Sequence, residues 1–562
     1  MSDINKWLNY QDLDVDLREE LLKMTKEEQL EAFYSELAFG TGGIRGIIGA
    51  GTNRINIYTL RKVNYGYGKF ILKHTNNHSV AIAYDTRYLS DVFALESARM
   101  LATLGIKVYL FQKVTPTPTL SFAIRHLNTG GGIVITASHN PKIYNGYKVY
   151  NEAGCQLLPD DALRVMEEIS NAPDSFAIAI DSVENLKDKG LIEYLDDQID
   201  LEYLNKVKSV QVHPELQKDS LKVVFTPLHG TGAYFGKRLL TELGYDYYVV
   251  DEQMVPDSEF STVPSPNPET LATFTFAIEY AKRYGAHVCV ATDPDSDRVG
   301  VVVLDNGEYK ILSGNQTGAI VLKYLAKNKK TLKPAVLINT IVTSELGTTI
   351  AKANGIEIIS TLTGFKYIAE QVGLLENSDR EFLFAYEESN GFLLGDFVRD
   401  KDAFQGLLII LEAVNYYHLK GMTLIDVLGE LDKSFGYYRD EQINFEFPGI
   451  SGLKQIQNIM NHFRNNNYNS FADYKIAAKE DYLLGKRFGL DAGNLALPQS
   501  DVIKYFFEDG DWLVLRPSGT EPKMKVYLSL HEENSLKISK KMKILKQEII
   551  KLIEKAGYTN ET

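Results

Sequence analysis

Short apolar runs and amphipathic stretches follow one another in the same order three times along the chain. In the first copy, the apolar run at 80–84 predicts a buried strand, and 90–104 predicts a helix that Ser90 caps. Gly105 ends that helix, and 106–111 predicts the next strand. In the second copy the same order predicts a strand at 221–225, a helix at 233–243 that Gly244 ends, and a strand at 247–250. In the third copy it predicts a strand at 335–339, a helix at 344–354 that Gly355 ends, and a strand at 356–360.

Each copy also contains a later apolar strand that runs into a polar loop. The strands and their loops are 132–136 with 137–141, 286–291 with 293–298, and 381–385 with 386–391. Binding sites in parallel α/β sheets form at the C-terminal ends of the strands. We therefore expect three similar domains with mixed α/β sheets, whose loops converge on a central cleft.

The last part of the chain follows a different pattern. Residues 420–432 predict a helix, and short strands such as 512–515 and 525–528 mix with helices beyond Gly436. This mixture predicts a smaller C-terminal α+β domain. The expected domain boundaries are 1–212, 213–325, 326–436 and 437–562.

Composition narrows the functional classes. The 562 residues include 60 Lys and Arg against 74 Asp and Glu, which gives a net charge of −14. An acidic chain without a basic tract is poorly suited to bind nucleic acid. The chain contains no apolar stretch of membrane-spanning length, and its first residues do not resemble a secretory signal. We expect a cytoplasmic protein that binds neither nucleic acid nor membranes; its oligomeric state stays open.

The cysteines point to the same compartment. Two of them, Cys155 and Cys289, cannot build a disulfide framework or a cysteine-rich zinc site. Cys289 lies in the apolar run 287–291, which predicts a buried free thiol. A reducing environment is expected.

Three aspartates at alternate positions are a candidate metal site. Asp293, Asp295 and Asp297 can direct carboxylate oxygens at one hard cation. An EF-hand is excluded because Arg298 and Leu304 stand where its glycine and glutamate are required. A solvated acidic turn is the alternative. The flanking strands and the adjacent arginine favour a metal beside an anionic ligand.

Ser138 follows an apolar strand at a sharp turn. Its hydroxyl is a candidate nucleophile or phosphorylation site, with His139 beside it. A plain strand-ending turn is the alternative, because Ser, Asn and Pro favour turns. The surrounding residues form neither a Ser-His-acid triad nor a Gly-x-Ser-x-Gly elbow.

Two further segments have the composition of phosphate-binding loops. The glycine-rich segment 40–46 carries Arg45, whose guanidinium can bind phosphate as a fork. A flexible turn is the alternative. The second segment contains Arg516, Ser518, Gly519 and Thr520, which together offer a cation, two hydroxyls and a glycine amide.

A third glycine pattern suggests a dinucleotide site. Gly230 and Gly232 follow a strand, and Asp251 stands near the expected position of a ribose-binding acid. The third glycine, Gly236, is one position late, so the fingerprint fails. We interpret Gly236 as a helix–strand packing position. A nicotinamide-dependent oxidoreductase is the alternative from another enzyme class.

Taken together, these segments resemble the α-D-phosphohexomutase superfamily, which contains phosphoglucomutases and phosphomannomutases. The resemblance covers nearly the whole chain in order. Residues 136–141 resemble the phosphoserine loop, 293–298 the magnesium loop, 386–391 the sugar-binding loop and 516–520 the phosphate-binding loop. The length and the segments 42–46 and 363–366 are most similar to long bacterial phosphoglucomutases, which resemble the eukaryotic phosphoglucomutase-2 and phosphopentomutase group.

The resemblance implies catalytic roles for several residues. Ser138 would carry the phosphoryl group with His139 beside it, and Lys148 would take part in proton transfer. Arg45 and Arg298 would steady the transferring group. The metal would be Mg²⁺, held by Asp293, Asp295, Asp297 and an oxygen on Ser138.

The resemblance also implies how a sugar phosphate binds. Lys366 would define sugar orientation, and Glu387 and Ser389 would hold sugar hydroxyls. Arg516, Ser518, Gly519 and Thr520 would bind the phosphate that is not reacting. Gly391 departs from relatives that carry a histidine there, which weakens a dual mannose and glucose specificity and leaves the general base open.

The implied activity is interconversion of glucose 1-phosphate and glucose 6-phosphate through a phosphoserine, with glucose 1,6-bisphosphate as intermediate and activator. Phosphopentomutase and phosphomannomutase activities on the same scaffold are alternatives. A non-catalytic sugar-phosphate sensor is a third possibility, against which the intact Ser138 and the three aspartates argue.

Overall fold

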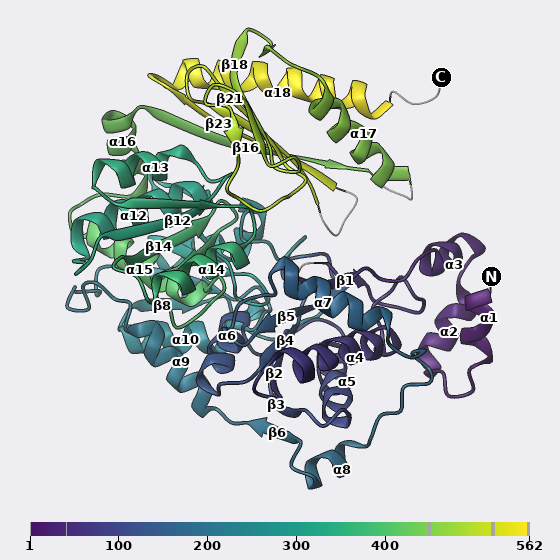
Figure 1. The fold of residues 1–562 in the computed structure, drawn as a ribbon. Coiled ribbons are helices and arrows are strands. Elements are labelled where there is room, and N and C mark those ends of the chain that lie inside the picture. Colours follow the sequence, from purple (N-terminus) through teal and green to yellow (C-terminus); the bar gives the residue numbers. More distant parts are fainter. Residues whose placement is uncertain (1, 41, 448–450, 519–522, 559–562) are drawn as a thin grey trace.

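A six-stranded mixed sheet organises the first part of the chain (Figure 1). The computed structural model describes residues 2–40, 42–447, 451–518 and 523–558. The strand order is β1-β5-β4-β2-β3-β6, in which β4, β2, β3 and β6 are parallel and β5 runs antiparallel to its neighbours β4 and β1. The strands are β1 (Gly43–Ile47), β2 (Ser79–Tyr84), β3 (Lys107–Phe111), β4 (Gly131–Ile135), β5 (Tyr144–Asn151) and β6 (Ile192–Leu195).

Alternation along β2 explains the layers around this sheet. Val80 and Ile82 face the core under α4 (Ile57–His74) and α5 (Ser90–Thr103). Ala81 and Ala83 point to the opposite face, which α6 (Thr117–His126) covers. Smaller helices surround this body: α1 (Ser2–Asn9), α2 (Val15–Lys23), α3 (Lys26–Phe33), α7 (Pro159–Ser170), α8 (Val183–Asp188) and α9 (Gln198–Lys208).

The second and third sheets repeat the central arrangement. The second has the order β11-β10-β9-β7-β8 and the third β13-β12-β14-β15. Their strands are β7 (Lys222–Thr226), β8 (Asp246–Val249), β9 (Val288–Thr292), β10 (Val299–Asp305), β11 (Glu308–Leu312), β12 (Ala335–Thr340), β13 (Glu357–Thr361), β14 (Glu381–Glu387) and β15 (Gly391–Leu393). Their helices are α10 (Gly232–Leu243), η1 (Asp251–Gln253), η2 (Leu271–Phe274), α11 (Thr275–Tyr284), α12 (Gly314–Asn328), α13 (Glu345–Ala353), α14 (Phe365–Leu375), α15 (Ala403–His418) and α16 (Leu424–Phe435).

In all three sheets a parallel strand, a polar loop and an antiparallel return strand occur in that order. The pairs are β4 with β5, β9 with β10, and β14 with β15. This common plan confirms the predicted three α/β domains with mixed sheets. The glycines predicted to end helices adopt left-handed φ values of 87° at Gly105, 79° at Gly244 and 68° at Gly355.

The three α/β sheets share one continuous apolar core. This core runs from α6 through β7 and β12 to α15, whose side chains are buried on nearly all sides. Because nearly every residue of α15 is buried and most of them are apolar, it lies as the central helix between layers. The three sheets are therefore fixed relative to one another by shared burial.

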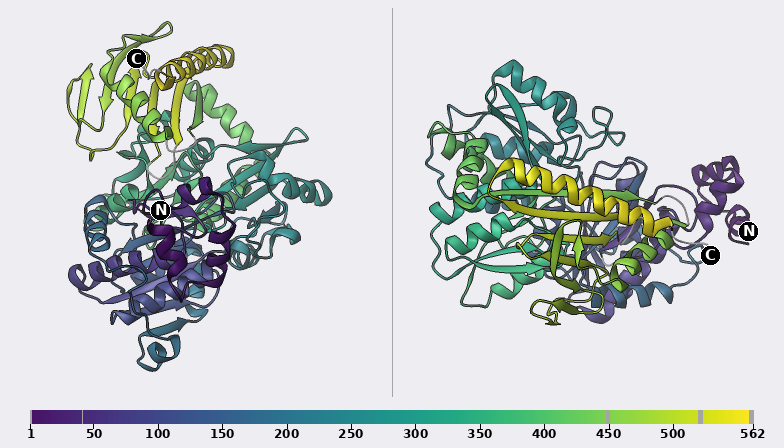
Figure 2. Two further views of the ribbon diagram at one scale, coloured as in Figure 1. Left: turned by 90° about the vertical axis from the view of Figure 1, so that its right-hand side faces the viewer. Right: turned by 90° about the horizontal axis from the view of Figure 1, so that it is seen from above.

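The C-terminal part has its own core. Its antiparallel sheet has the order β16-β23-β22-β21-β18-β19-β20, with α17 and α18 on one face (Figures 1 and 2). The cluster of Ile341, Val342 and Leu362 with Trp512 joins this sheet to the third α/β sheet. The elements are β16 (Tyr437–Glu446), α17 (Ser451–Asn465), β17 (Ser470–Phe471), β18 (Tyr474–Asp481), β19 (Lys486–Gly489), β20 (Gly493–Asn494), β21 (Ile503–Phe507), β22 (Trp512–Pro517), β23 (Lys523–Glu532) and α18 (Ser535–Tyr558). This arrangement confirms the predicted fourth domain.

Four local predictions are corrected. Ser90 does not cap α5: Leu89 holds the N-cap position, and the Ser90 hydroxyl donates to Asp85 Oδ1 at 2.7 Å instead. The helix predicted from 420 begins at Leu424, because the Thr423 side chain caps it in a capping box. The glycine-rich loop becomes strand from residue 43, and Arg516 lies in β22 rather than in a loop.

The domain boundaries stay predictions. The predicted boundary between residues 325 and 326 falls inside α12. Because α12 packs against α13 and β14 of the third domain, a boundary before Gly314 would keep this helix with the domain that it contacts. Cys289 is buried and free, as predicted. In the described ranges, we find no helix with the length and apolar character needed to cross a membrane.

Candidate active site

The loop between β4 and β5 holds Ser138 in a strained backbone conformation. Its φ of 49° lies in the left-handed region, which costs energy for a residue with a side chain. The Ser138 amide donates to Thr136 Oγ1 at 2.8 Å, and Arg87 donates to the carbonyl oxygens of Ser138 and Asn140 at 2.6 Å each. These contacts fix the buried serine at the C-terminal end of the sheet.

Arg87 is a site residue that the sequence analysis missed. Its buried guanidinium also donates to the carbonyl oxygens of Pro141 and Tyr144, at 3.1 and 3.0 Å. Asp85 lies 3.5 Å from its Nε and balances its charge. The sequence does carry a signal that could have identified Arg87: Asp85 and Arg87 stand two residues apart, directly after the apolar strand at 80–84.

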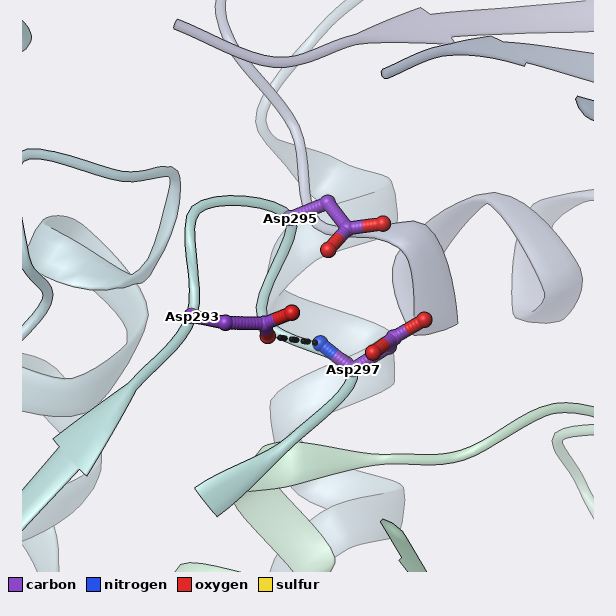
Figure 3. Close-up of side chains that lie close together, drawn as sticks. All are labelled: Asp293, Asp295 and Asp297. Carbon is purple, nitrogen blue, oxygen red and sulfur yellow. Dashed lines mark hydrogen bonds between the residues drawn. The ribbon is translucent and has the colours of Figure 1, made fainter. Parts of the chain in front are cut away.

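The loop between β9 and β10 gathers the three aspartates (Figure 3). Asp293, Asp295 and Asp297 are at most 1% exposed, and each offers a carboxylate oxygen within 4.8 Å of the others. Asp293 Oδ1 accepts hydrogen bonds from the amides of Asp297 and Arg298, at 3.0 and 2.9 Å. Ser296, at a φ of 55°, turns the chain so that the three side chains share one space.

The serine loop and the aspartate loop meet directly. Ser138 Oγ donates to Asp293 Oδ2 at 2.7 Å, although the two residues belong to different sheets. His139 Nδ1 lies 3.1 Å from the same hydroxyl. Burial and the charges of Arg298 and Arg45 lower the pKa of His139 well below its ordinary value, so its ring is neutral near pH 7.

The aspartates have the properties of a cation site. Burial and the neighbouring carboxylates of Asp295 and Asp297 raise the pKa of Asp293 well above its ordinary value. Asp295 Oδ1 and Asp297 Oδ1 are buried without a hydrogen-bond partner in the part of the chain that the structure describes. Three converging carboxylates, two of them with an oxygen that accepts no hydrogen bond from a described residue, fit a hard divalent cation, which would relieve their repulsion.

Lys148 reaches the aspartates from β5. Its Nζ lies 2.6 Å from Asp295 Oδ2 and 3.2 Å from Asp297 Oδ2. Burial opposes its charge, but Asp295 and Asp297 outweigh that effect and raise its pKa. Thr117, from the start of α6, also donates to Asp295 Oδ2 at 2.9 Å. The sequence analysis missed Thr117, which carries no local sign of a role.

Lys401 is a second lysine that the sequence analysis missed. Its Nζ lies 3.1 Å from Asp297 Oδ2 and 3.5 Å from Asp400 Oδ1. Burial opposes its charge, but Asp297 and Asp400 raise its pKa above the ordinary value. Its side chain covers Gly391 in the sugar-binding loop. The run 399–402, with four charged residues before the apolar α15, was the available signal.

Arg45 and Arg298 flank this centre with partners of their own. Arg45 stands in β1 opposite Gly146 and donates to Asn140 Oδ1 at 3.0 Å. Arg298 Nη1 lies 2.5 Å from Glu269 Oε1. Both guanidinium groups are thus held beside the loops that carry the serine and the aspartates.

The sugar-binding loop lies against the start of α14. Glu387 Oε1 accepts a hydrogen bond from the Gly364 amide at 3.1 Å, which joins the loop to the helix that carries Lys366. Burial lowers the pKa of Lys366 to about 8. Ser389 is half-buried in the turn between β14 and β15. The structure thereby brings Lys366 and Glu387 to one edge of the third sheet.

The C-terminal domain contributes its β22–β23 hairpin. Arg516 pairs across the sheet with Lys525, and its Nη1 donates to the Tyr527 hydroxyl at 3.5 Å. The Ser518 amide donates to the Lys523 carbonyl at 2.7 Å. The predicted phosphate-binding residues Gly519 and Thr520 lie outside the described residues.

The glycines of the suspected dinucleotide pattern have packing roles. A Cβ at Gly230 would stand 2.4 Å from Pro294 Cα, and one at Gly232 would stand 2.5 Å from Thr292 Oγ1. A Cβ at Gly236 would meet the Phe225 ring at 2.2 Å, which confirms the predicted helix–strand packing. Two of these glycines therefore let α10 approach the aspartate loop, and the space is filled by protein.

Sequence comparison covers the whole architecture. The chain matches models of the phosphoglucomutase/phosphomannomutase family for alpha/beta/alpha domain I over 36–175, domain II over 201–307, domain III over 313–434 and the C-terminal domain over 464–537. With the four-domain fold, these matches define the chain as a phosphohexomutase, an intramolecular phosphotransferase. More narrowly, the chain belongs to the phosphoglucomutase/phosphomannomutase family.

Named relatives extend the comparison. A phosphoglucomutase of Staphylococcus haemolyticus is 39% identical over 540 residues, covering 95% of this chain and 97% of the relative. A phosphoglucomutase of Staphylococcus aureus is 39% identical over 508 residues, covering 90% of this chain and 91% of the relative. The fold is shared with the phosphoglucomutase parafusin of Paramecium in an open form, at a TM-score of 0.67 and 17% identity over 94% of this chain and 98% of that one. The fold is also shared with a phosphoglucomutase/phosphomannomutase family protein of Burkholderia thailandensis. The TM-score is 0.66 and the sequence identity 18%, over 93% of this chain and 98% of that one.

Proposed function

We propose that this protein is a phosphoglucomutase that interconverts glucose 1-phosphate and glucose 6-phosphate through a phosphorylated Ser138. The observation that carries the proposal is the 2.7 Å contact between Ser138 Oγ and Asp293 Oδ2 inside the buried aspartate cluster. Phosphoryl transfer needs charge neutralisation and alignment more than covalent chemistry by the protein. A strained serine beside three carboxylates and several cations supplies both.

The aspartates would hold Mg²⁺ together with an oxygen on Ser138. When bound, the metal supplies neutralisation of the phosphoryl charge. Arg45, which donates to Asn140 of the serine loop, and Arg298, at the end of the aspartate loop, would bind the equatorial oxygens of the transferring group.

Protons must move in both half-reactions. In the first, the bond between phosphorus and Ser138 Oγ breaks, a bond from phosphorus to the sugar 6-oxygen forms, and the hydroxyl proton ends on Ser138 Oγ. In the second, the 1-phosphoryl group moves to Ser138 Oγ and the serine proton ends on the sugar 1-oxygen. Lys148 and Lys401 are protonated and adjoin the aspartates, so they are the groups suited to give a proton to the departing oxygen.

The bisphosphate must turn end for end between the half-reactions, so the site must hold either phosphate at its distal end. Arg516, Ser518, Gly519 and Thr520 would bind that distal phosphate. Lys366, Glu387 and Ser389 would hold the sugar in both orientations. Added glucose 1,6-bisphosphate would phosphorylate Ser138 and so activate the enzyme.

The proposal includes the cell compartment. Cys155 and Cys289 are buried free thiols, which suit a reducing environment. We place the enzyme in the cytoplasm, with a small sugar phosphate as its substrate.

A rate comparison tests the proposal. Wild-type protein and Ser138→Ala are assayed with Mg²⁺ and bisphosphate on the 1-phosphates of glucose, mannose, glucosamine and ribose. We expect the highest kcat/KM on glucose 1-phosphate, no turnover by Ser138→Ala, and one phosphoryl group on Ser138 by peptide mapping. The surface variant Ser170→Ala is the matched control and should behave as wild type.

Each rival function gives a different result. Faster turnover of ribose or mannose 1-phosphate would reassign the sugar. Sugar-phosphate binding without turnover would indicate a sensor, and saturable NADH binding would indicate an oxidoreductase. Near-normal turnover by Ser138→Ala would refute the phosphoserine mechanism itself.

A further inference from the structure

A cavity separates the N-terminal helices from the first sheet, away from the aspartates. Its volume is about 440 Å³, within the range of small-molecule sites. One wall comes from α2, and the others come from the end of β1, the start of α5 and the segment after the serine loop. The family domains match only from residue 36, so the α2 wall lies before the matched part of the chain.

The cavity walls are apolar and partly exposed to water. Leu17, Ile48 and Leu89 line it together with Val92 and Ile143. Val92 on α5 is 43% exposed, and Ile143, in the turn before β5, is 51% exposed. A ligand with an apolar body would remove this surface from water, which favours binding.

Carboxylates outnumber cations at the rim. Asp14, Asp16, Glu20 and Glu259 reach the cavity, and Lys142 is the one cation among the described residues that line it. Lys142 already pairs with Glu259 at 2.5 Å. Asp14 also accepts hydrogen bonds from the Asp16 and Leu17 amides, and Glu20 accepts one from the Ala50 amide at 3.0 Å. The excess of negative charge at the rim attracts a positive group and repels a negative one.

We propose that this cavity is a second, regulatory site that binds a small organic amine with an apolar body. The apolar walls would hold the body and the carboxylates at the rim would hold the ammonium group. This site is distinct from the proposed sugar-phosphate site and shares none of its residues.

The walls of the cavity are continuous with the serine loop. Tyr88 and Leu89 directly follow Arg87, whose guanidinium holds the backbone around Ser138. Asn145, just after the loop, donates through Nδ2 to the Tyr88 carbonyl at 3.1 Å.

A second connection runs through the residues that follow Pro141. The Ile48 amide donates to the Ile143 carbonyl at 2.9 Å, which ties the cavity wall to β1. The Lys142–Glu259 ion pair joins the first and second domains at the rim. An amine that fills the cavity therefore restrains the loop that positions Ser138, and we expect it to change kcat more than KM.

The test compares three probes with the same body: 4-phenylbutylamine, 4-phenylbutanol and 4-phenylbutyrate. Binding to the full-length protein is measured by isothermal titration calorimetry. We expect the amine to bind roughly tenfold more tightly than the carboxylate, with the alcohol between them. Equal affinities for the amine and the carboxylate would overturn the proposal.

Two variants locate the binding and a third serves as the control. Val92→Arg places a bulky cation in the cavity and should weaken amine binding roughly tenfold or more. Glu20→Gln should narrow the preference for amine over alcohol. Glu184→Gln alters an exposed acid on α8 and should change neither the affinity for the amine nor the preference for the amine over the alcohol. Amine binding that survives Val92→Arg contradicts the site, and a wild-type kcat unaffected by saturating amine contradicts the coupling to Ser138.

Discussion

Lys401 lies over Gly391, with its Cδ 2.3 Å from the point where a Cβ at position 391 would stand. The absence of a side chain in the sugar-binding loop therefore makes room for a lysine that contacts Asp297. Relatives with a histidine at the position of Gly391 would carry a titratable group in this space. In this chain Lys401, from the segment before α15, occupies that space.

This relationship predicts the effect of Gly391→Ala. The added methyl group should displace the Lys401 side chain rather than disrupt the fold, because the clash is with its Cγ and Cδ and not with the backbone. We expect kcat to fall roughly tenfold, with little change in thermal stability. Lys401→Met should lower kcat at least as far. Wild-type kcat in both variants would exclude Lys401 from the reaction.

The aspartate cluster predicts dependence on a divalent cation. Chelation should abolish turnover, and Mg²⁺ should restore it. Asp295→Asn removes one of three charges, so the Mg²⁺ concentration for half-maximal activity should rise roughly tenfold or more. Asp251→Asn, an exposed acid of the second domain, is the control and should leave this concentration unchanged. Full activity in chelator would rule out a metal at these aspartates.

Arg87 should position Ser138 rather than react. Arg87→Lys keeps the charge but loses the fork that reaches four carbonyl oxygens. We expect the free energy of unfolding to fall by about 2 kcal/mol or more, because charged hydrogen bonds are lost at buried acceptors. Denaturant titration measures this change, and kcat should fall while KM stays near the wild-type value. Arg164→Lys on exposed α7 is the control. A KM effect without a kcat effect would argue against positioning.

The carboxyl group of Glu388 should make the free energy of unfolding depend on pH. Burial and the adjacent charge of Glu387 raise its pKa from 4.5 to about 7. Between these values the folded protein binds more protons at this carboxyl than the unfolded chain does. Its contribution to stability is therefore complete below pH 4.5 and is lost as the pH rises to about 7. In Glu388→Gln, the decline of unfolding free energy from pH 5 to pH 7 should become shallower. An unchanged slope, or the same change in Glu184→Gln, would contradict this assignment.

Replacing Arg516 in the C-terminal domain should weaken substrate binding. A guanidinium on a phosphate contributes about 1.5–3 kcal/mol per charged hydrogen bond, so Arg516→Ala should raise KM for glucose 1-phosphate roughly tenfold or more. Arg516→Lys should recover part of that loss, because it keeps the charge without the fork. Steady-state kinetics of both variants and of the exposed control Lys486→Ala measure the effect. An unchanged kcat/KM in Arg516→Ala would remove this hairpin from the active site.

Much of the architecture could be predicted because its signals are local. Apolar runs at β4, β9 and β14 are fully or largely buried, and the glycines that end α5, α10 and α13 need the left-handed conformation. The aspartate motif was also recognisable, because three carboxylates at alternate positions stand in one turn between two apolar runs. Local prediction failed where tertiary contacts compete. Ser90 was expected to cap its helix, but Asp85 takes its hydroxyl.

The sequence by itself determined the order of the elements, the resemblance to the family and the residue types available for phosphoryl transfer. Only the tertiary structure decided which of them meet. Ser138 and Asp293 are 155 residues apart, and Lys401 and Asp297 come from different domains. Their convergence depends on the apolar core that the three α/β sheets share around α15, and such long-range burial leaves no pattern in any one segment.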